Sequence, residues 1–236
     1  MTRHELKELQ QDQFATKVVD AVGFVSTHRS MAIRWTLIAL AVVLLVGGGY
    51  RFYTQKRAER QADLREAFDT LEGSAGAQAN PYTKNFSSVD ERDAASLKAF
   101  SQVAAKYSGS KEGYLAQYYV AILRNSKGDT DAAISILREV AGCRYSVATL
   151  AKVALANLLA GQGKYPEAEQ ILRSLVDKPT DLVSKKSAQV LLARLIGKHD
   201  PKAARALLSS IEAGKRDPEH PAIVRAIQIV GGELNQ

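Results

Sequence analysis

Cysteine is almost absent from this 236-residue chain, because Cys143 is the only one. A single thiol cannot form an intramolecular disulfide, a CxxC redox pair or a metal site built from cysteines. Cys143 follows Gly142, and we expect it to pack as a small hydrophobic side chain, with a reactive thiol as the less favoured alternative. The cysteine count fits a cytoplasmic or a periplasmic domain, so it does not decide the compartment.

Motifs that support catalysis or metal binding are also missing. The four histidines are His4, His28, His199 and His220, and none has a second ligand type at metal-binding spacing within a helical turn. The GxSxG, HExxH and GxxxxGK patterns do not occur, and no nucleophile has a candidate base beside it. We therefore predict that the protein is not an enzyme and uses no metal, cofactor or small-molecule substrate.

A concentrated basic patch is missing too, although the net charge is +7. The excess lies mainly beyond residue 72 and is spread along the chain, with no basic run interleaved with aromatic residues. This pattern argues against a nucleic-acid partner, because nucleic-acid-binding domains gather Lys and Arg on one face or in a recognised motif. Acidic partners and anionic lipid headgroups remain open alternatives.

The chain does contain one long uncharged run, residues 35–50. The wider apolar window 33–53 has about the 20 residues that a helix needs to cross roughly 30 Å of hydrocarbon. Amphipathic rings prefer the headgroup region, and the window has aromatic side chains at both ends that we expect to anchor it: Trp35, Tyr50, Phe52 and Tyr53. We predict a single transmembrane helix over 33–53.

Two alternatives compete with a membrane anchor. A buried helix of a soluble domain would normally have a polar face, which this run lacks. A cleavable signal peptide would have a short charged leader and a nearby small-residue cleavage site, whereas 34 residues precede the run and a basic, bulky segment, 51–60, follows it. Both alternatives are less favoured than a retained span.

Helical spacing of apolar residues extends on both sides of the span. Residues 1–32 form a head in which Leu6, Leu9, Phe14 and Val18 make one stripe, so we expect an amphipathic helix that lies on lipid or on a protein partner, with a weakly ordered leader as the alternative.

After the span, residues 54–72 form a helical stalk with a thin apolar seam. Residues 73–92 lose this periodicity and suggest a linker, so a folded domain is expected over 93–236.

The segment after the linker contains an internal repeat. A small residue is followed four positions later by a large one at spacings of 37, 35 and 35 residues, in the pairs Ser96 and Phe100, Ala133 and Leu137, Ala168 and Leu172, and Ala203 and Leu207. Three positions further on stand Val103, Val140, Leu175 and Ser210, so the last unit fits less well. Repeats of this length predict paired helices that stack on one another.

Glycine or proline before each second helix supports this division. Turns at 127–129, 163–166 and 198–201 would separate first helices near 113–125, 148–160 and 185–196 from the helices that follow. Residues 217–221 would end one helix and begin a terminal cap with Ile223, Ile227 and Val230 on one side. The predicted fold is all-α: an amphipathic head, one transmembrane helix with its stalk, and a tetratricopeptide-like solenoid, with a generic array of helical hairpins as the alternative.

A solenoid of this kind offers a concave surface made by its first helices. The repeat register points six residues toward that surface as candidate partner-binding residues: Leu115, Tyr118, Ile122, Leu150, Val153 and Asn157. Tyrosine gives a large contact area at a modest entropic cost, so Tyr118 is the first candidate. The alternative is that Tyr118 or its neighbour Tyr119 simply packs between helices.

The order of parts resembles the YfgM-like family of ancillary Sec translocon subunits. The similarity includes the amphipathic head near 13–25, the span, the aromatic and basic exit 49–53, the stalk 58–71 and the repeats, of which 155–175 is the clearest. The resemblance implies a bacterial inner-membrane protein with a cytoplasmic head and a periplasmic C-terminal domain. It also implies protein partners: translocon subunits, periplasmic chaperones or emerging client chains.

These features favour a membrane-tethered protein-binding module near the translocon. A scaffold for an envelope complex, such as one coordinating cell-wall synthesis with division, is the alternative function. Basic residues near the span are more numerous after it than before it, and the positive-inside rule by itself would favour a cytoplasmic C-terminal domain. The sequence thus supports two orientations, of which the family resemblance favours the periplasmic one.

Overall fold

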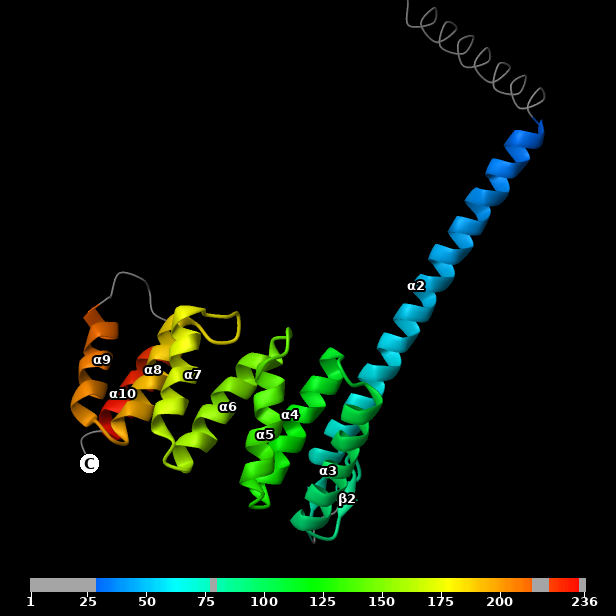
Figure 1. Cartoon of the computed structure of the whole chain (residues 1–236). Helices are drawn as coiled ribbons and strands as arrows, with labels where there is room; N and C mark the ends of the chain where they lie inside the picture. Colours follow the sequence, from blue (N-terminus) through cyan, green and yellow to red (C-terminus); the bar gives the residue numbers. More distant parts are fainter. Residues whose placement is uncertain (1–28, 77–79, 214–220, 234–236) are drawn as a thin grey trace, which may run out of the picture. The chain divides into compact units, whose positions relative to one another are not determined.

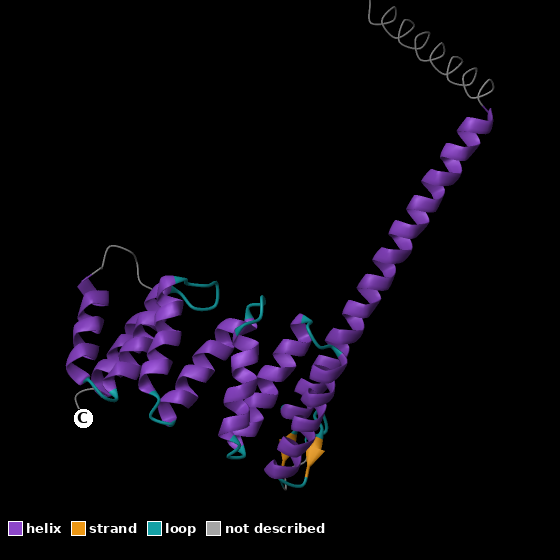
Figure 2. Ribbon diagram, viewed as in Figure 1, coloured by secondary structure: helices purple, strands orange, loops and turns teal. Residues whose placement is uncertain are grey.

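The computed structural model describes residues 29–76, 80–213 and 221–233. The chain forms two compact units, one ending at Glu59 and the other beginning at Arg60. The elements in chain order are α2 (Arg29–Leu71), β1 (Ser74–Ala75), β2 (Asn85–Phe86), α3 (Val89–Lys106), α4 (Lys111–Ser126), α5 (Thr130–Ala141), α6 (Val147–Gly161), α7 (Tyr165–Asp177), α8 (Lys185–Gly197), α9 (Pro201–Ala213) and α10 (Pro221–Glu233). Within these described ranges the fold is all-helical apart from the two short strands, which appear in orange in Figure 2.

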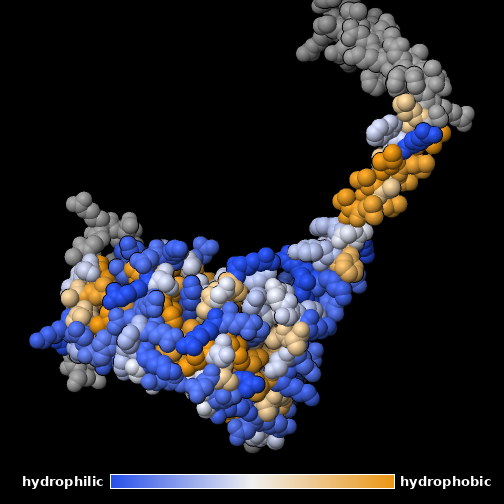
Figure 3. All heavy atoms as spheres, in the orientation of Figure 1, coloured by the Kyte–Doolittle hydropathy of each residue, from blue (hydrophilic) through white to orange (hydrophobic). Residues whose placement is uncertain are grey.

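Helix α2 contains the uncharged run and is long and apolar enough to cross a membrane. Its apolar window is not covered by any part of the described chain. Figure 3 shows this window as a nearly continuous hydrophobic band. All four expected anchoring aromatics at its ends are exposed: Trp35, Tyr50, Phe52 and Tyr53. The predicted head helix falls almost entirely in residues 1–28, which lie outside the described residues.

The second unit is a row of antiparallel helices. From α3 to α9, helices that are consecutive in the chain pack chiefly against one another, which gives the stacked hairpins of a tetratricopeptide-like solenoid (Figure 1). The first helices α4, α6 and α8 match the predicted ranges to within about two residues at each end. Gly128 and Gly163 occupy the turns after α4 and α6 with φ of 85° and 75°, where a residue with a Cβ would be strained.

The repeat register is confirmed in three units and wrong in the fourth. Ser96, Ala133 and Ala168 are fully buried, whereas Ala203 is exposed and its neighbour Ala204 is buried. The small and large pair taken at a spacing of 35 residues, Ala203 and Leu207, is one position early, and the buried set is Ala204, Leu208 and Ile211. The spacing grows by one because Pro166 is the second residue of α7 but Pro201 is the first residue of α9. Proline is tolerated throughout the first helical turn, so it marks the turn and not one position within it.

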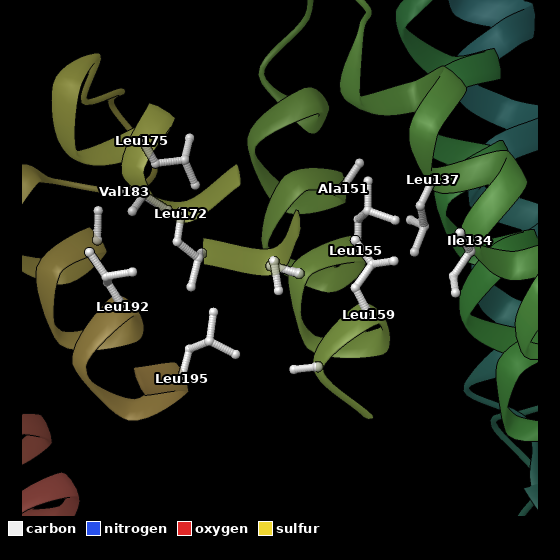
Figure 4. Close-up of a cluster of buried hydrophobic side chains, with 14 of the residues drawn as sticks. Ile134, Leu137, Ala151, Leu155, Leu159, Leu172, Leu175, Val183, Leu192 and Leu195 are labelled. Atoms are coloured by element: carbon white, nitrogen blue, oxygen red, sulfur yellow. The ribbon is translucent and has the colours of Figure 1, made fainter. Parts of the chain in front are cut away.

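The main hydrophobic core runs through the middle of the second unit. Figure 4 shows side chains from α5, α6, α7 and α8 meeting in one cluster, which includes Leu137, Leu155, Leu159, Leu172 and Leu192. A separate cluster at the C-terminal end joins α8, α9 and α10. Ile227 and Val230 are buried in it, so α10 covers the last hairpin as a cap.

The first cluster of the second unit includes the last turns of α2. Leu64 and Ala67 are buried with Phe100 and Val103 of α3, and Phe68 packs edge-on against Phe100 at 5.2 Å between ring centroids. Sequence periodicity places these turns in a stalk and the domain start at Asp93. In the structure they belong to the compact unit that begins at Arg60, because Leu64, Phe68 and Leu71 pack against the cluster formed with α3 and α4.

Candidate functional site

Three of the six predicted partner-binding residues lie on α4 and three on α6. Ile122 and Leu150 are 37% and 38% exposed, which is unusual for large apolar side chains in the folded unit, and Asn157 is also exposed. Leu115, Tyr118 and Val153 are half-buried against the central core. The two sets share the spacing i, i+3, i+7, which places each set on one side of its helix. We call these six residues the α4–α6 face.

Tyr118 and Tyr119 are adjacent but differ in environment. Tyr119 stacks on Phe100 at 5.0 Å and belongs to the first cluster, so it is the tyrosine packed between helices. Tyr118 lies edge-on to Tyr119 at 5.4 Å, and burial together with the neighbouring phenol raises the pKa of Tyr118. Tyr118 is therefore neutral at physiological pH, with its ring partly available for contact.

The corresponding side of α8 is only partly apolar. Buried positions of α6 and α8 correspond at a spacing of 37 residues, as in Ala151 and Ala188 or Leu155 and Leu192. By this spacing Val190 is the counterpart of Val153, and Val190 packs under α10. The counterparts of Leu150 and Asn157 are the half-buried Ser187 and the exposed Arg194, so the apolar stripe does not continue on α8.

A loop between α7 and α8 adds an apolar residue that the sequence analysis missed. Val183 inserts into the central core, and Thr180 accepts a hydrogen bond from the Val183 backbone N–H at 3.2 Å. The next residue back, Leu182, is left 52% exposed. Thr149, beside Leu150, contacts Thr180 at 3.3 Å between hydroxyl oxygens, which ties the loop to α6. A leucine and valine inside a polar loop were the sequence feature that could have revealed this contact.

Polar contacts join the end of α2 to α3. The Asp63 carboxylate accepts hydrogen bonds from Lys106 Nζ at 2.8 Å and from the Tyr107 hydroxyl at 2.7 Å. These two bonds lower the pKa of Asp63, more than partial desolvation raises it. A pocket of about 330 Å³ lies beside them, lined by Asp63, Glu66, Ala67, Thr70, Ala99, Gln102, Val103 and Lys106. This network fixes helix packing and was not apparent from the sequence.

Histidine and cysteine side chains have structural contacts. His199 Nε2 lies 3.0 Å from Glu169 Oε1, and the His199 ring is 4.9 Å from Tyr165, so it links the α8–α9 turn to α7. Cys143 is half-buried at the edge of the central core. Within the described ranges, no three His, Cys, Asp or Glu side chains come together as a metal ion would require.

The stacked hairpins and the exposed face define a helical-repeat protein of the kind that typically serves as a non-enzymatic scaffold for protein interactions. Residues 31–181 match the tetratricopeptide repeat-like domain family, and the chain belongs to that family. No curated protein matches.

Two solved structures with the same fold come from Podosopora anserina. One is a protein provisionally described as a kinesin light chain with nearly identical TPR-like repeats, and the other is a variant of it. Each is 16% identical to this chain, with TM-scores of 0.53 for the first and 0.54 for the variant. The matches cover 75% of this chain and 85% and 84% of those chains, respectively. At this identity the similarity shows the fold alone.

Proposed function

We propose that this protein is a membrane-anchored protein-binding module that acts beside the Sec translocon, where it holds emerging client chains or a periplasmic chaperone. The observation that supports it is the presence in one chain of an uncovered apolar helix and a tetratricopeptide-like solenoid with an exposed apolar face. The order of these parts, which resembles ancillary translocon subunits, supports the choice of site.

The mechanism is binding and positioning. A single span would confine the solenoid to the membrane surface, which raises its effective concentration near other proteins of the same membrane. The α4–α6 face would supply apolar contact area, with Tyr118 as a rigid aromatic contact. Weak individual contacts are sufficient in this arrangement, because tethering replaces part of the affinity that a soluble protein would need.

Crosslinking tests the partner. A photoreactive amino acid at Ile122 or Leu150 of the full-length protein, followed by purification in mild detergent, is expected to capture translocon subunits, chaperones or exported chains. The same amino acid at Lys202, on the exposed side of α9, is the control position and should capture far less. Capture of cell-wall synthesis or division proteins instead would support the envelope-scaffold alternative and contradict the translocon proposal.

Thiol labelling tests the orientation. Because Cys143 is the only cysteine, a Cys143→Ser variant with a new cysteine at exposed Lys202 has one accessible thiol. A membrane-impermeant maleimide should label it in intact spheroplasts if the solenoid is periplasmic. Labelling only after lysis would place the solenoid in the cytoplasm and remove the proposed role at the translocon exit.

A further inference from the structure

The loops that precede the first helices lie along one edge of the second unit (Figure 1). Those loops are residues 107–110, 142–146 and 178–184. The Tyr145 hydroxyl donates a hydrogen bond to the Gly109 carbonyl oxygen at 3.4 Å, which joins the first two loops. The hydroxyl oxygens of Thr149 and Thr180 are 3.3 Å apart, which joins the start of α6 to the third loop. We call these loops, with the first four residues of the helix after each, the entry edge.

The chain enters the second unit at this edge. Arg60 is the first residue of the unit, and its Nε atom lies 3.5 Å from Glu112 Oε2 in the first turn of α4. Asp63 accepts a hydrogen bond from the Tyr107 hydroxyl at 2.7 Å. Only seven positions separate Arg60 from Tyr53, where the apolar window ends, and a chain of that length reaches at most about 25 Å. A membrane span over the window, as proposed above, would therefore keep the start of the entry edge near the bilayer surface.

Charge distinguishes the entry edge from the opposite edge. The opposite edge consists of the turns after the first helices and the first four residues of each helix that follows, which are residues 127–133, 162–168 and 198–204. It contains four lysines and four acidic side chains, so its charges cancel. The entry edge contains two acidic side chains, Glu112 and Asp181. Its basic side chains number five: Lys111, Arg144, Lys178, Lys185 and Lys186. The entry edge is therefore basic, whereas the opposite edge is neutral.

Two of these lysines stand where they do not stabilise their helix. The positive end of a helix dipole lies at the N-terminus, so acidic side chains stabilise the first turn and basic side chains destabilise it. Helices α5 and α7 follow this preference, with Asp131 and Glu167 in their first turns. Helix α8 has no acidic residue in its first turn and begins with Lys185 and Lys186. Helix stability does not explain these lysines, whereas attraction to an anionic surface would.

The entry edge has basic and apolar side chains available for contact outside the unit. Four of its basic residues are exposed and take part in none of the ion pairs formed among the described residues: Lys111, Arg144, Lys178 and Lys185. Leu182, in the third loop, is 52% exposed. The opposite edge, all of whose residues are described, exposes no large apolar side chain. Basic residues beside an exposed apolar one are typical of surfaces that bind at a lipid interface.

We propose that the entry edge binds the surface of a bilayer that contains anionic phospholipids. The lipid phosphates would attract the exposed lysines and Arg144, and Leu182 would insert among the headgroups. Each basic side chain near an anionic membrane adds to this attraction, and salt screens it over roughly 8–10 Å. The inference rests on the proposed function for the membrane span. It adds a second membrane contact, by which the solenoid itself would be oriented on the bilayer.

Lipid quenching in nanodiscs tests the inference with the full-length protein. In a Cys143→Ser background, an NBD fluorophore is attached at Ser146→Cys on the entry edge or at Ala203→Cys on the opposite edge, both exposed positions. The nanodiscs contain phosphatidylcholine with a nitroxide on its headgroup, with or without phosphatidylglycerol. With phosphatidylglycerol at low salt, quenching should be at least about threefold stronger for the Ser146→Cys label than for the Ala203→Cys label.

The dependence on lipid charge decides the result. The ratio of quenching between the two labels should fall when phosphatidylglycerol is left out or when salt is raised, because both changes weaken the attraction. Equal quenching of the two labels overturns the proposal and leaves the basic edge for an acidic protein. A ratio that neither phosphatidylglycerol nor salt changes also overturns it, because the tether alone would then account for the proximity.

Matched variants locate the effect. Lys178→Gln with Lys185→Gln should reduce quenching of the Ser146→Cys label at least about twofold. Lys127→Gln with Lys198→Gln makes the same charge change on exposed positions of the opposite edge and should leave the quenching unchanged. An equal loss in both double variants would assign the effect to net charge and overturn the inference.

Flotation separates this inference from the proposed function. The span predicts that the full-length protein floats with phosphatidylcholine liposomes even at high salt, because burial of the apolar window does not depend on charge. Release from these liposomes at high salt would remove the span and overturn both proposals. Retention in the membrane with equal quenching of the two labels would overturn the inference alone.

Discussion

Helix α6 and the apolar part of α2 have similar compositions but opposite environments. Lys152 is the only charged residue of α6, whose 15 residues from Val147 to Gly161 contribute Leu155 and Leu159 to the central core. The apolar window of α2 is uncovered along its length. Apolar composition therefore does not by itself distinguish a core helix from a membrane span.

Length and flanking residues do distinguish them. At 1.5 Å per residue, α6 reaches about 22 Å, short of the roughly 30 Å of a hydrocarbon layer. It is bounded by turns that return the chain to α5 and α7, so its apolar surface meets other helices. The window in α2 is long enough to span and has exposed aromatic residues at its ends, among them Trp35 and Tyr50.

The largest expected effect on stability concerns the last turns of α2, which follow the apolar window and belong to the folded unit. A fragment of residues 60–236 should be soluble and fold cooperatively, because it keeps Leu64 and Ala67 in the first cluster. A fragment of residues 93–236 loses both and uncovers Phe100, which should cost on the order of 5 kcal/mol or more. Circular dichroism melts of the two fragments measure the difference. Equal melting temperatures would show that residues 60–92 form a stalk and linker outside the folded domain.

Matched leucines in α2 and α6 test the comparison itself. Leu159 is 0% exposed and Leu44 is 66% exposed. Leu159→Ala should destabilise the solenoid by about 2–5 kcal/mol, whereas Leu44→Ala should leave solenoid unfolding unchanged. Thermal unfolding of full-length variants in the same detergent, followed by far-ultraviolet circular dichroism, provides the measurement. A large loss in Leu44→Ala would mean that the window packs on the folded unit.

The corrected register of α9 predicts a smaller difference between neighbours. Ala204 is fully buried and Ala203 is exposed, so Ala204→Leu should overpack the α8–α9 contact and cost about 1–3 kcal/mol. Ala203→Leu should change stability by less than about 0.5 kcal/mol. Urea unfolding of the two variants gives the comparison, and the reverse order would restore the register in which Ala203 and Leu207 are the inward-facing pair.

Much of the fold was predictable from the sequence because local rules determine it. The turn glycines Gly128 and Gly163 and the buried alanines Ala133 and Ala168 are set by steric requirements inside one hairpin. The cap contact of α10 followed from the same periodicity. Binding of a partner by the α4–α6 face is still a prediction.

The features that escaped prediction depend on contacts distant in sequence. Leu64 and Phe68 form a seam too thin to indicate burial until α3 and α4 pack on them. Val183 in the α7–α8 loop becomes a core residue only because the central cluster has space for it. Hydrogen bonds such as that between Asp63 and Tyr107, 44 positions apart, have no sequence pattern.

The second part of α2 also differs from the window by its polar contacts, and Asp63 gives the smallest expected effect. Asp63→Asn removes the charge that Lys106 and Tyr107 contact. The Asp63 side chain is 34% exposed, so we expect the free energy of unfolding to fall by only about 1 kcal/mol. The folded pKa of Asp63 lies below its ordinary value of 3.8. The stabilisation is therefore complete above pH 3.8 and disappears as the pH falls through the folded pKa.

Urea unfolding of the wild type and of Asp63→Asn as a function of pH measures this contribution. The stability difference should be constant near neutral pH and should shrink toward zero in acid, because protonated Asp63 then resembles asparagine. Lys56→Ala provides the control, since Lys56 pairs with Glu59 at 3.2 Å outside the solenoid and its loss should leave the unfolding curve unchanged at every pH. A difference that persists unchanged in acid would show that Asp63 acts through its shape and not through its charge.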